Sequence, residues 1–215
     1  MGADRPKQYL GLAGRTVIEH TLRRLCGHRR IAGVVVCIAA EDPFWLRLQP
    51  DMPPLLDIAP GGPRRADSVL NGLSVLHRHG SDDDWVLVHD AVRPCLRAAD
   101  IDSLIEAAGE HPDGGLLAMP VSDTLKRVDA AGRVLETVSR EGLWRAATPQ
   151  MFPLGRLTAA LEAAREAGAA VTDEAGAMER AGARPRVVAC APDNIKITHP
   201  QDLALAAAIL TGGEE

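Results

Sequence analysis

Short apolar runs alternate along the chain with longer segments in which apolar residues recur at helical spacing. The apolar runs are typical of buried strands, and they lie at 33–40, 55–59, 85–89, 115–119 and 186–190. The segments with helical spacing predict helices at 16–27, 64–76, 101–108, 154–167, 174–182 and 198–210. Strands that alternate with helices indicate an α/β fold, with a mostly parallel, twisted sheet and helices on both of its faces.

Two segments depart from this alternation of strands and helices. Residues 124–128 and 133–138 alternate apolar and polar positions around the turn-forming sequence Asp129-Ala-Ala-Gly132, which predicts a β-hairpin. We expect this hairpin to protrude as an arm at about 122–141. Because the sequence shows no internal repeat and no low-complexity linker, residues 1–215 are predicted to form a single domain that carries the arm. The proline-rich stretch before residue 55 is expected to be irregular.

The composition narrows the class of protein. Hydrophobic residues make up 46% of the chain and charged residues 25%, which excludes a disordered chain. A net charge of −5 and an aromatic content of 3% disfavour binding to nucleic acid or to an anionic membrane. The longest apolar runs, such as 204–210, are far short of the ~20 residues of a membrane span. We therefore expect a soluble, cytoplasmic protein with neither nucleic acid nor membrane as a partner.

The cysteines also indicate a cytoplasmic protein. The chain has four of them and no CxxC pair. Cys37 and Cys190 lie in predicted strands, so we expect buried free thiols in a reducing environment.

Charged residues gather where the predicted strands end. In an open parallel sheet, ligands bind beyond the carboxyl ends of the strands. Polar residues at single strand ends are most often turn formers, but here several strand ends carry charged or hydroxyl groups. The cations that outweigh the one carboxylate, Asp90, are Lys7, Arg65, Arg93, Arg140 and Lys196. This balance favours an anionic ligand, for which phosphate is the common choice.

Seven motifs, in order, resemble those of the 2-C-methyl-D-erythritol 4-phosphate cytidylyltransferases. They are RPKQYL, GGxxRADSVLNGL, VLVHDAVRP, DTLKR, LWRAATPQ, TDEAGAME and DNIKIT, and the resemblance runs from Met1 to about Leu210. It implies a Rossmann-like nucleotidyltransferase fold, a homodimer that exchanges its hairpin arms, and a divalent metal, usually Mg²⁺. The implied reaction is attack by an oxygen of the acceptor phosphate on the α-phosphorus of CTP, with release of pyrophosphate.

The resemblance also implies roles for individual residues. Lys7 and Lys196 are the implied catalytic residues. The implied CTP contacts are Lys7, Gly62, Ser68 and Asp90, and Asp90 lies near the metal. The implied contacts of the acceptor substrate are Asp90, Arg93, Thr124, Arg140, Thr148 and Lys196, with Thr124 and Arg140 reaching the acceptor phosphate of the partner subunit.

The physical chemistry of the reaction agrees with this set of residues. Phosphoryl-type transfer needs positioning and cations around the developing charge more than covalent help. A phosphate acceptor is already ionised at pH 7, because its second pKa is ~6, so no general base is required. His89 is predicted to point to the other side of its strand from Asp90 and to serve in packing.

The chain departs from the family at two points. The family begins with a strand and a glycine-rich AAGxGxRM loop, and Met1 resembles the last residue of that loop. We therefore expect the first strand, the loop and its arginine to be missing here. In addition, Pro63 follows Gly62 where the family has another residue, and proline has no N–H to donate. Two alternatives stay open: a cytidylyltransferase for another polyol phosphate, such as ribitol 5-phosphate, and an inactive, truncated dimeric fragment.

Overall fold

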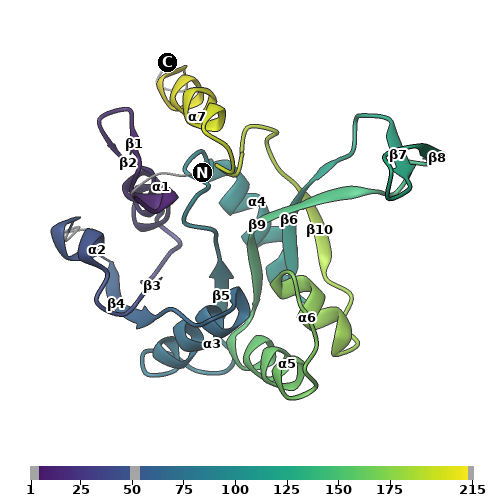
Figure 1. Ribbon diagram of the computed structural model, residues 1–215. Coiled ribbons are helices and arrows are strands. Elements are labelled where there is room, and N and C mark those ends of the chain that lie inside the picture. The colour runs from purple at the N-terminus through teal and green to yellow at the C-terminus, as the bar shows by residue number, and fades with distance from the viewer. Residues whose placement is uncertain (1–4, 49–53, 213–215) are drawn as a thin grey trace.

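The computed structural model describes residues 5–48 and 54–212, and a four-stranded sheet lies at its centre (Figure 1). The strand order is β10 (Arg186–Ala189), β6 (Gly115–Pro120), β9 (Trp144–Pro153) and β5 (Trp85–Val88). β10 is parallel to β6, whereas β9 is antiparallel to both β6 and β5. The predicted α/β class is confirmed, but β9 makes this sheet mixed.

A second, parallel pair of strands lies beside this sheet. It consists of β3 (Val34–Ile38) and β4 (Leu55–Pro60). In the described residues no hydrogen-bonded ladder joins this pair to β5. The predicted continuous sheet is therefore divided into two parts.

The helices lie close to the predicted segments. They are α1 (Val17–Cys26), α2 (Pro43–Leu48), α3 (Arg65–Leu76), α4 (Ala98–Gly109), α5 (Leu154–Glu166), α6 (Glu174–Arg180) and α7 (Gln201–Gly212). The shortest elements are η1 (Lys7–Tyr9), β1 (Gly11–Leu12) and β2 (Arg15–Thr16). α2 replaces part of the stretch that we expected to be irregular. The carboxylate of Asp42 accepts hydrogen bonds from the amides of Phe44 and Trp45, and Pro43 opens the helix.

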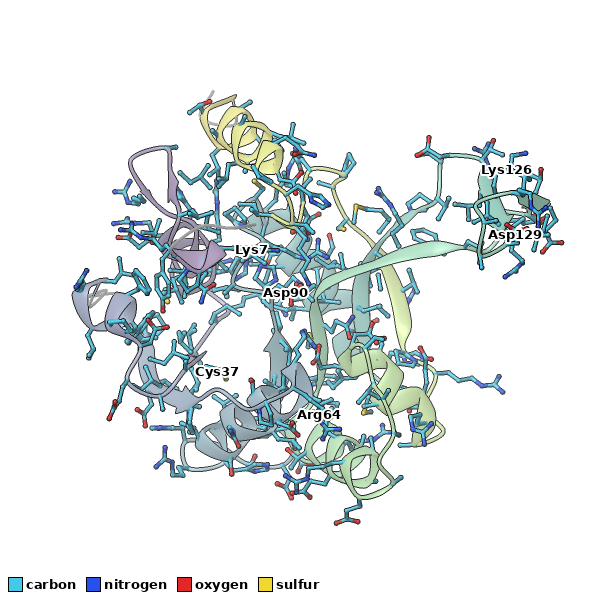
Figure 2. The ribbon with its side chains drawn as sticks, in the orientation of Figure 1. Lys7, Cys37, Arg64, Asp90, Lys126 and Asp129 are labelled. Atoms are coloured by element: carbon cyan, nitrogen blue, oxygen red, sulfur yellow. The ribbon has the colours of Figure 1, made fainter. Side chains whose placement is uncertain are left out.

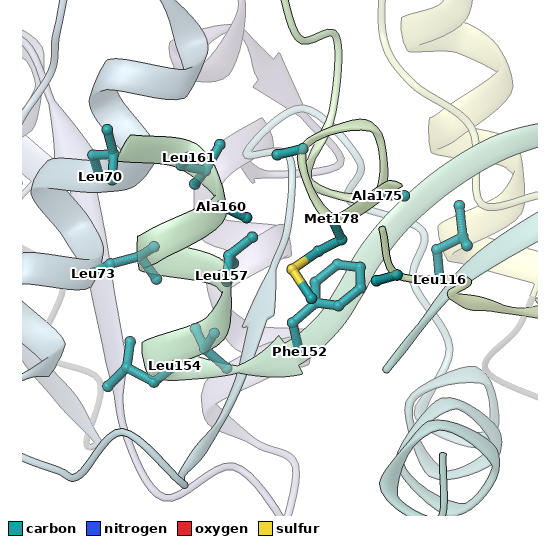
Figure 3. Packing of buried hydrophobic residues seen from close by; sticks show 13 residues of the cluster. Leu70, Leu73, Leu116, Phe152, Leu154, Leu157, Ala160, Leu161, Ala175 and Met178 are labelled. Carbon is teal, nitrogen blue, oxygen red and sulfur yellow. The ribbon is translucent and has the colours of Figure 1, made fainter. Parts of the chain in front are cut away.

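Helices cover both faces of the four-stranded sheet. Leu116 and Phe152 pack with residues of α3, α5 and α6 on one face (Figure 3). Leu117 and Met151, their neighbours along β6 and β9, pack with residues of α4 on the other face. Because adjacent residues of a strand point to opposite faces, the two clusters form separate core layers.

The hairpin protrudes from this core (Figure 1). β7 (Leu125–Val128) and β8 (Val134–Val138) pair antiparallel, as the alternation predicts. Gly132 has a φ of 79° in the turn, a value that favours glycine. Val134 and Leu135 are 61% and 62% exposed, so these two side chains have little cover from the described part of the chain.

The prediction of buried cysteines is wrong for two of them. All four are free thiols; Cys95 is buried, but Cys37 is exposed and Cys190 is partly buried. Cys37 is exposed because its strand, β3, borders the gap between the two parts of the sheet.

Candidate active site

Asp90 lies just beyond the carboxyl end of β5 (Figure 2), and three cations surround its carboxylate. The ammonium nitrogen of Lys196 lies 2.9 Å from Oδ2 of Asp90. Nε of Arg65 lies 3.3 Å from Oδ1, and Nε of Arg93 lies 3.4 Å from Oδ2. The structure thus brings together residues from the ends of β4, β5 and β10, as the strand-end argument predicts.

These cations determine the charge of Asp90. Burial alone would raise the pKa of this carboxyl group. The hydrogen bond from Lys196 and the charges of Arg65, Lys196 and Arg93 outweigh burial and lower the pKa below its ordinary value. Asp90 is therefore a carboxylate at neutral pH.

Thr148 and His89 hold the backbone beside Asp90. The hydroxyl of Thr148 accepts a hydrogen bond from the Asp90 amide at 3.1 Å and lies 3.0 Å from Nδ1 of His89. Nε2 of His89 lies 3.1 Å from the carbonyl oxygen of Arg93. Burial lowers the pKa of His89 to about 4, so its ring is neutral at pH 7. His89 therefore does more than pack: it links β9 to the loop that follows β5.

Asn194 fastens the loop that carries Lys196. Its carbonyl oxygen accepts a hydrogen bond of 2.8 Å from Nη1 of Arg93, and its side-chain amide donates one of 2.9 Å to the carbonyl of Thr148. Asn194 and Thr148 are buried, and Arg93 nearly so. The DNIKIT motif is the signal in the sequence, but we assigned Asn194 no role from it.

A bidentate ion pair positions Arg65. Its Nη1 and Nη2 atoms lie 2.6 and 3.0 Å from the two carboxylate oxygens of Glu174, which is fully buried. The same guanidinium reaches Asp90 through Nε. Such a fork fixes the orientation of both groups. Glu174 lies in the TDEAGAME motif, but it is not among the site residues predicted from the sequence.

Gly62 and Ser68 meet at the start of α3, as their shared implied role requires. The amide of Gly62 donates to the hydroxyl of Ser68 at 2.9 Å. A Cβ on Gly62 would lie 2.5 Å from Cβ of Asp67, so only glycine lets the backbone pass there. Ser68 lines a cavity of about 300 Å³ together with Arg65 and Asp90.

A second cavity, of about 370 Å³, borders the same cation cluster. Arg93, Arg145, Asn194 and Lys196 contribute to its lining. Asp90 lines the first cavity and Lys196 the second, so their ion pair lies between the two. The positive lining of the second cavity suits an anionic group. Arg145 was not among the residues predicted from the sequence.

Three residues of the predicted site form no hydrogen bond or ion pair with this cluster within the described part of the chain. Lys7 is partly buried on η1. Its charge is one of the weaker influences that lower the pKa of Asp202, after the hydrogen bonds from the His199 and Thr198 amides. Asp202 lines the second cavity. Thr124 and Arg140 are exposed at the base of the hairpin, where Arg140 donates to the carbonyl of Ser122.

Metal ligands are sparse in the described part of the chain. No group of three or more His, Cys, Asp or Glu side chains there is arranged to hold a metal ion. Asp90 offers one carboxylate beside a cavity. That fits Mg²⁺, which commonly takes one or two carboxylates and completes its coordination with water and substrate phosphates.

Among the described residues, no helix is long and apolar enough to cross a bilayer.

Comparison with known proteins agrees with this site. A family model described as 2-C-methyl-D-erythritol 4-phosphate cytidylyltransferase matches residues 1–212. The protein of that name from Pseudomonas putida strain GB-1 is 54% identical over 204 residues, which are 94% of this chain and 87% of the relative. The one from Pseudomonas aeruginosa strain UCBPP-PA14 is 55% identical over the same shares.

Solved structures show the same likeness. A crystal structure of a 4-diphosphocytidyl-2C-methyl-D-erythritol synthase has a TM-score of 0.87 and 40% identity, and the match covers 95% of each chain. The Francisella tularensis 2-C-methyl-D-erythritol 4-phosphate cytidylyltransferase has a TM-score of 0.85 and 36% identity, with 96% of this chain and 94% of that chain covered. On the motifs, the clustered site residues and these matches, the chain belongs to the 2-C-methyl-D-erythritol 4-phosphate cytidylyltransferase family.

Proposed function

We propose that this chain transfers the cytidylyl group of CTP to 2-C-methyl-D-erythritol 4-phosphate, giving 4-diphosphocytidyl-2-C-methyl-D-erythritol and pyrophosphate. The observation that carries the proposal is the cluster of Arg65, Arg93 and Lys196 around Asp90, between two cavities. The family match supports the identity of both substrates. The matched relatives favour methylerythritol phosphate over other polyol phosphates as the acceptor.

The cluster supplies the charge that the reaction needs. An oxygen of the acceptor phosphate forms a bond to the α-phosphorus of CTP, and the bond to the leaving pyrophosphate breaks. Lys196 and Lys7 are proposed to stabilise the negative charge that develops on the phosphates, as compact ammonium donors. Arg93 and Thr148 hold the acceptor side, and Gly62 and Ser68 the cytidine side.

No side chain has to remove a proton. The acceptor phosphate is ionised at pH 7, with a second pKa of ~6. His89 is neutral, and both of its ring nitrogens already lie within hydrogen-bond distance of Thr148 and the Arg93 carbonyl. We assign His89 to positioning Asp90 and Arg93 rather than to proton transfer.

A divalent cation, usually Mg²⁺ in the family, is part of the proposal. When bound, Mg²⁺ would neutralise charge on the triphosphate and orient it. Asp90 is the residue that would hold it, together with phosphate oxygens. Lys196 and Arg65 then keep this carboxylate ionised and fixed in orientation.

The hairpin is proposed to join two chains into a homodimer. Its apolar side chains are exposed in the single chain, and they include Val128, Val134 and Leu135. A two-stranded hairpin is marginally stable alone, so a partner subunit is the surface that we expect it to pack on. In that arrangement Thr124 and Arg140 reach the acceptor phosphate in the partner's site.

The function is tested by measuring pyrophosphate release. We expect release with CTP and methylerythritol phosphate, and little with ribitol 5-phosphate. Lys196→Ala should lower turnover by ~10²–10³-fold, the usual loss for one such donor. Arg78→Ala is the control, because Arg78 lines neither cavity and pairs with the partly exposed Asp57. Equal turnover with both acceptors, or an unaffected Lys196→Ala variant, would overturn the assignment.

A further inference from the structure

The hydroxyl of Tyr9 is bound to a buried carboxylate from a distant part of the chain. It donates a hydrogen bond of 2.9 Å to Oδ2 of Asp42, 33 residues away. Tyr9 is 2% exposed and Asp42 8% exposed. Burial, followed by the hydrogen bond to Asp42 and the charge of Asp42, raises the pKa of Tyr9 above its ordinary value of 10.0. The hydroxyl therefore stays protonated and remains a donor at neutral pH.

The other oxygen of Asp42 holds the start of α2. Oδ1 accepts hydrogen bonds from the amides of Phe44 and Trp45 at 2.9 and 3.2 Å. Hydrogen bonds to an ionised acceptor are roughly twice as strong as those between neutral groups. Glu41, directly before Asp42, has a φ of 56°, in the left-handed region that non-glycine residues seldom adopt. Backbone strain of this kind persists where surrounding contacts hold it, and the carboxylate of Asp42 supplies such contacts on both sides.

Aromatic contacts reinforce the same junction. The rings of Tyr9 and Phe44 stack with their centroids 5.3 Å apart. The guanidinium carbon of Arg5 lies 5.5 Å from the centroid of the Phe44 ring, within the range of a cation–π contact. The segment from Arg5 to Tyr9 is thus fastened to the beginning of α2 at both of its ends.

The fastened segment is the turn that carries Lys7. The 3₁₀ turn η1 begins at Lys7 and ends at Tyr9. The amide of Leu10 donates to the carbonyl of Lys7 at 3.1 Å, and the amide of Tyr9 donates to the carbonyl of Pro6 at 3.0 Å. Because one residue separates Lys7 from Tyr9, the position of the Tyr9 side chain determines where the backbone of Lys7 lies.

The same turn is linked to the candidate active site. Tyr9 belongs to a buried cluster against which Ala91, in the loop after β5, also packs. Hydrogen bonds from two backbone amides lower the pKa of Asp202, and the charge of Lys7 adds to this effect. Asp202 lines the second cavity together with Lys196. The charge of Lys7 is therefore felt at the wall of that cavity.

We propose that Asp42 and Tyr9 are positioning residues that hold Lys7 in place for the transfer reaction, an inference that rests on the proposed function. The carboxylate of Asp42 fixes the hydroxyl of Tyr9, the Tyr9 side chain fixes the turn η1, and the turn fixes Lys7. Both residues act through Lys7 rather than on the substrates. A charged group that stabilises a transition state loses much of its effect when it is displaced, and a displacement of about 1 Å can cost ~10²-fold in rate.

A double-mutant cycle on pyrophosphate release tests this role. Tyr9→Phe removes one hydroxyl group and keeps the ring that stacks on Phe44, whereas Asp42→Ala removes the whole carboxylate. We expect each change to lower kcat about tenfold and to leave the KM for the acceptor within about twofold of wild type. Lys7→Ala alone should lower kcat by ~10²–10³-fold. In that background neither change should lower kcat by more than about twofold further, because the residue that they position is gone.

Two further variants make the test specific. Asp42→Asn keeps an oxygen for the amides of α2 and places an NH₂ group where it can donate to the Tyr9 oxygen. Its kcat should return to within about threefold of wild type. Asp113→Ala is the matched control, because Asp113 accepts hydrogen bonds from Arg156 and from the Arg184 amide and lines neither cavity. It should leave kcat unchanged in both backgrounds.

A purely structural role gives a different result. Losses from Tyr9→Phe and Asp42→Ala that multiply with the loss from Lys7→Ala would overturn the proposal, and so would a wild-type kcat in both single variants. If the wild-type chain releases no pyrophosphate, the proposed function fails, and calorimetric titration with CTP runs the same cycle on binding. Weaker binding after Tyr9→Phe that disappears in the Lys7→Ala background supports the positioning role. Equal or absent binding in all of these chains overturns it.

Discussion

Protonation of His89 should lower the stability of the protein in mildly acidic solution. Its pKa is about 4 in the folded protein, lowered by burial from the ordinary value of 6.5. Between these pH values the unfolded chain binds more protons than the folded one. The free energy of unfolding should therefore fall as pH drops from about 6.5 towards 4, by roughly 3 kcal/mol at ~1.4 kcal/mol per pKa unit.

Urea unfolding at several pH values measures this effect. His89→Gln keeps a polar group beside Thr148 but cannot titrate, so its stability should change much less over the same interval. His79→Gln is the matched control, because His79 is exposed, and it should retain the wild-type slope. A stability difference between wild type and His89→Gln that stays constant between pH 6.5 and 4 would contradict the neutral, half-buried state of His89.

The contrast between predicted and missed residues has a physical cause. Asp90, Arg93 and Lys196 follow the ends of strands within short motifs, and Thr148 lies in the TPQ motif, so the sequence alone points to them. The role of Glu174 depends on Arg65, which lies 109 residues away along the chain. The residues next to Glu174 in the sequence carry no information on such a distant contact. A carboxylate after Thr-Asp indicates only the start of a helix.

Elements with strong local signals were predicted well. α1 begins at Thr16, whose hydroxyl accepts from the Glu19 amide while the Glu19 carboxylate accepts from the Thr16 amide at 2.7 Å. β9 was missed because Pro149 stands in its middle, and proline within a run argues against a central strand. β9 nevertheless joins β6 and β5, because it pairs with β6 through one edge and with β5 through the other.

The hairpin gives a prediction at the scale of an element. If β7 and β8 pack on a partner subunit, Leu135→Asp places a charge in an apolar interface. We expect the dissociation constant of the dimer to rise at least tenfold, measured by analytical ultracentrifugation. The circular dichroism of the domain should be unchanged, because Leu135 is 62% exposed in the single chain.

Glu136→Ala is the control for this change. Glu136 is the next residue on β8 and pairs with Arg127 across the hairpin. Exposed ion pairs contribute little free energy to stability, so this variant should dimerise like wild type. A Leu135→Asp protein that stays dimeric would exclude the apolar side of the hairpin as the interface.

The last prediction concerns the dimer as a unit. In the proposed arrangement each active site combines Lys196 of one chain with Arg140 of the other. Arg140→Ala and Lys196→Ala homodimers should then each be nearly inactive, because every site lacks one of the two cations. In a mixed dimer the two-fold symmetry places both changes in one site and leaves the other site intact.

Refolding the two variants together in equal amounts makes the test quantitative. About half of the dimers are mixed, and each has one intact site, so activity should return to roughly a quarter of wild type. Native mass spectrometry measures the fraction of mixed dimers in the same sample. If mixed dimers form and activity stays at the level of the homodimers, Arg140 and Lys196 serve the same subunit's site, or Arg140 serves none. A monomeric enzyme cannot produce the quarter, because no chain in the mixture carries both cations.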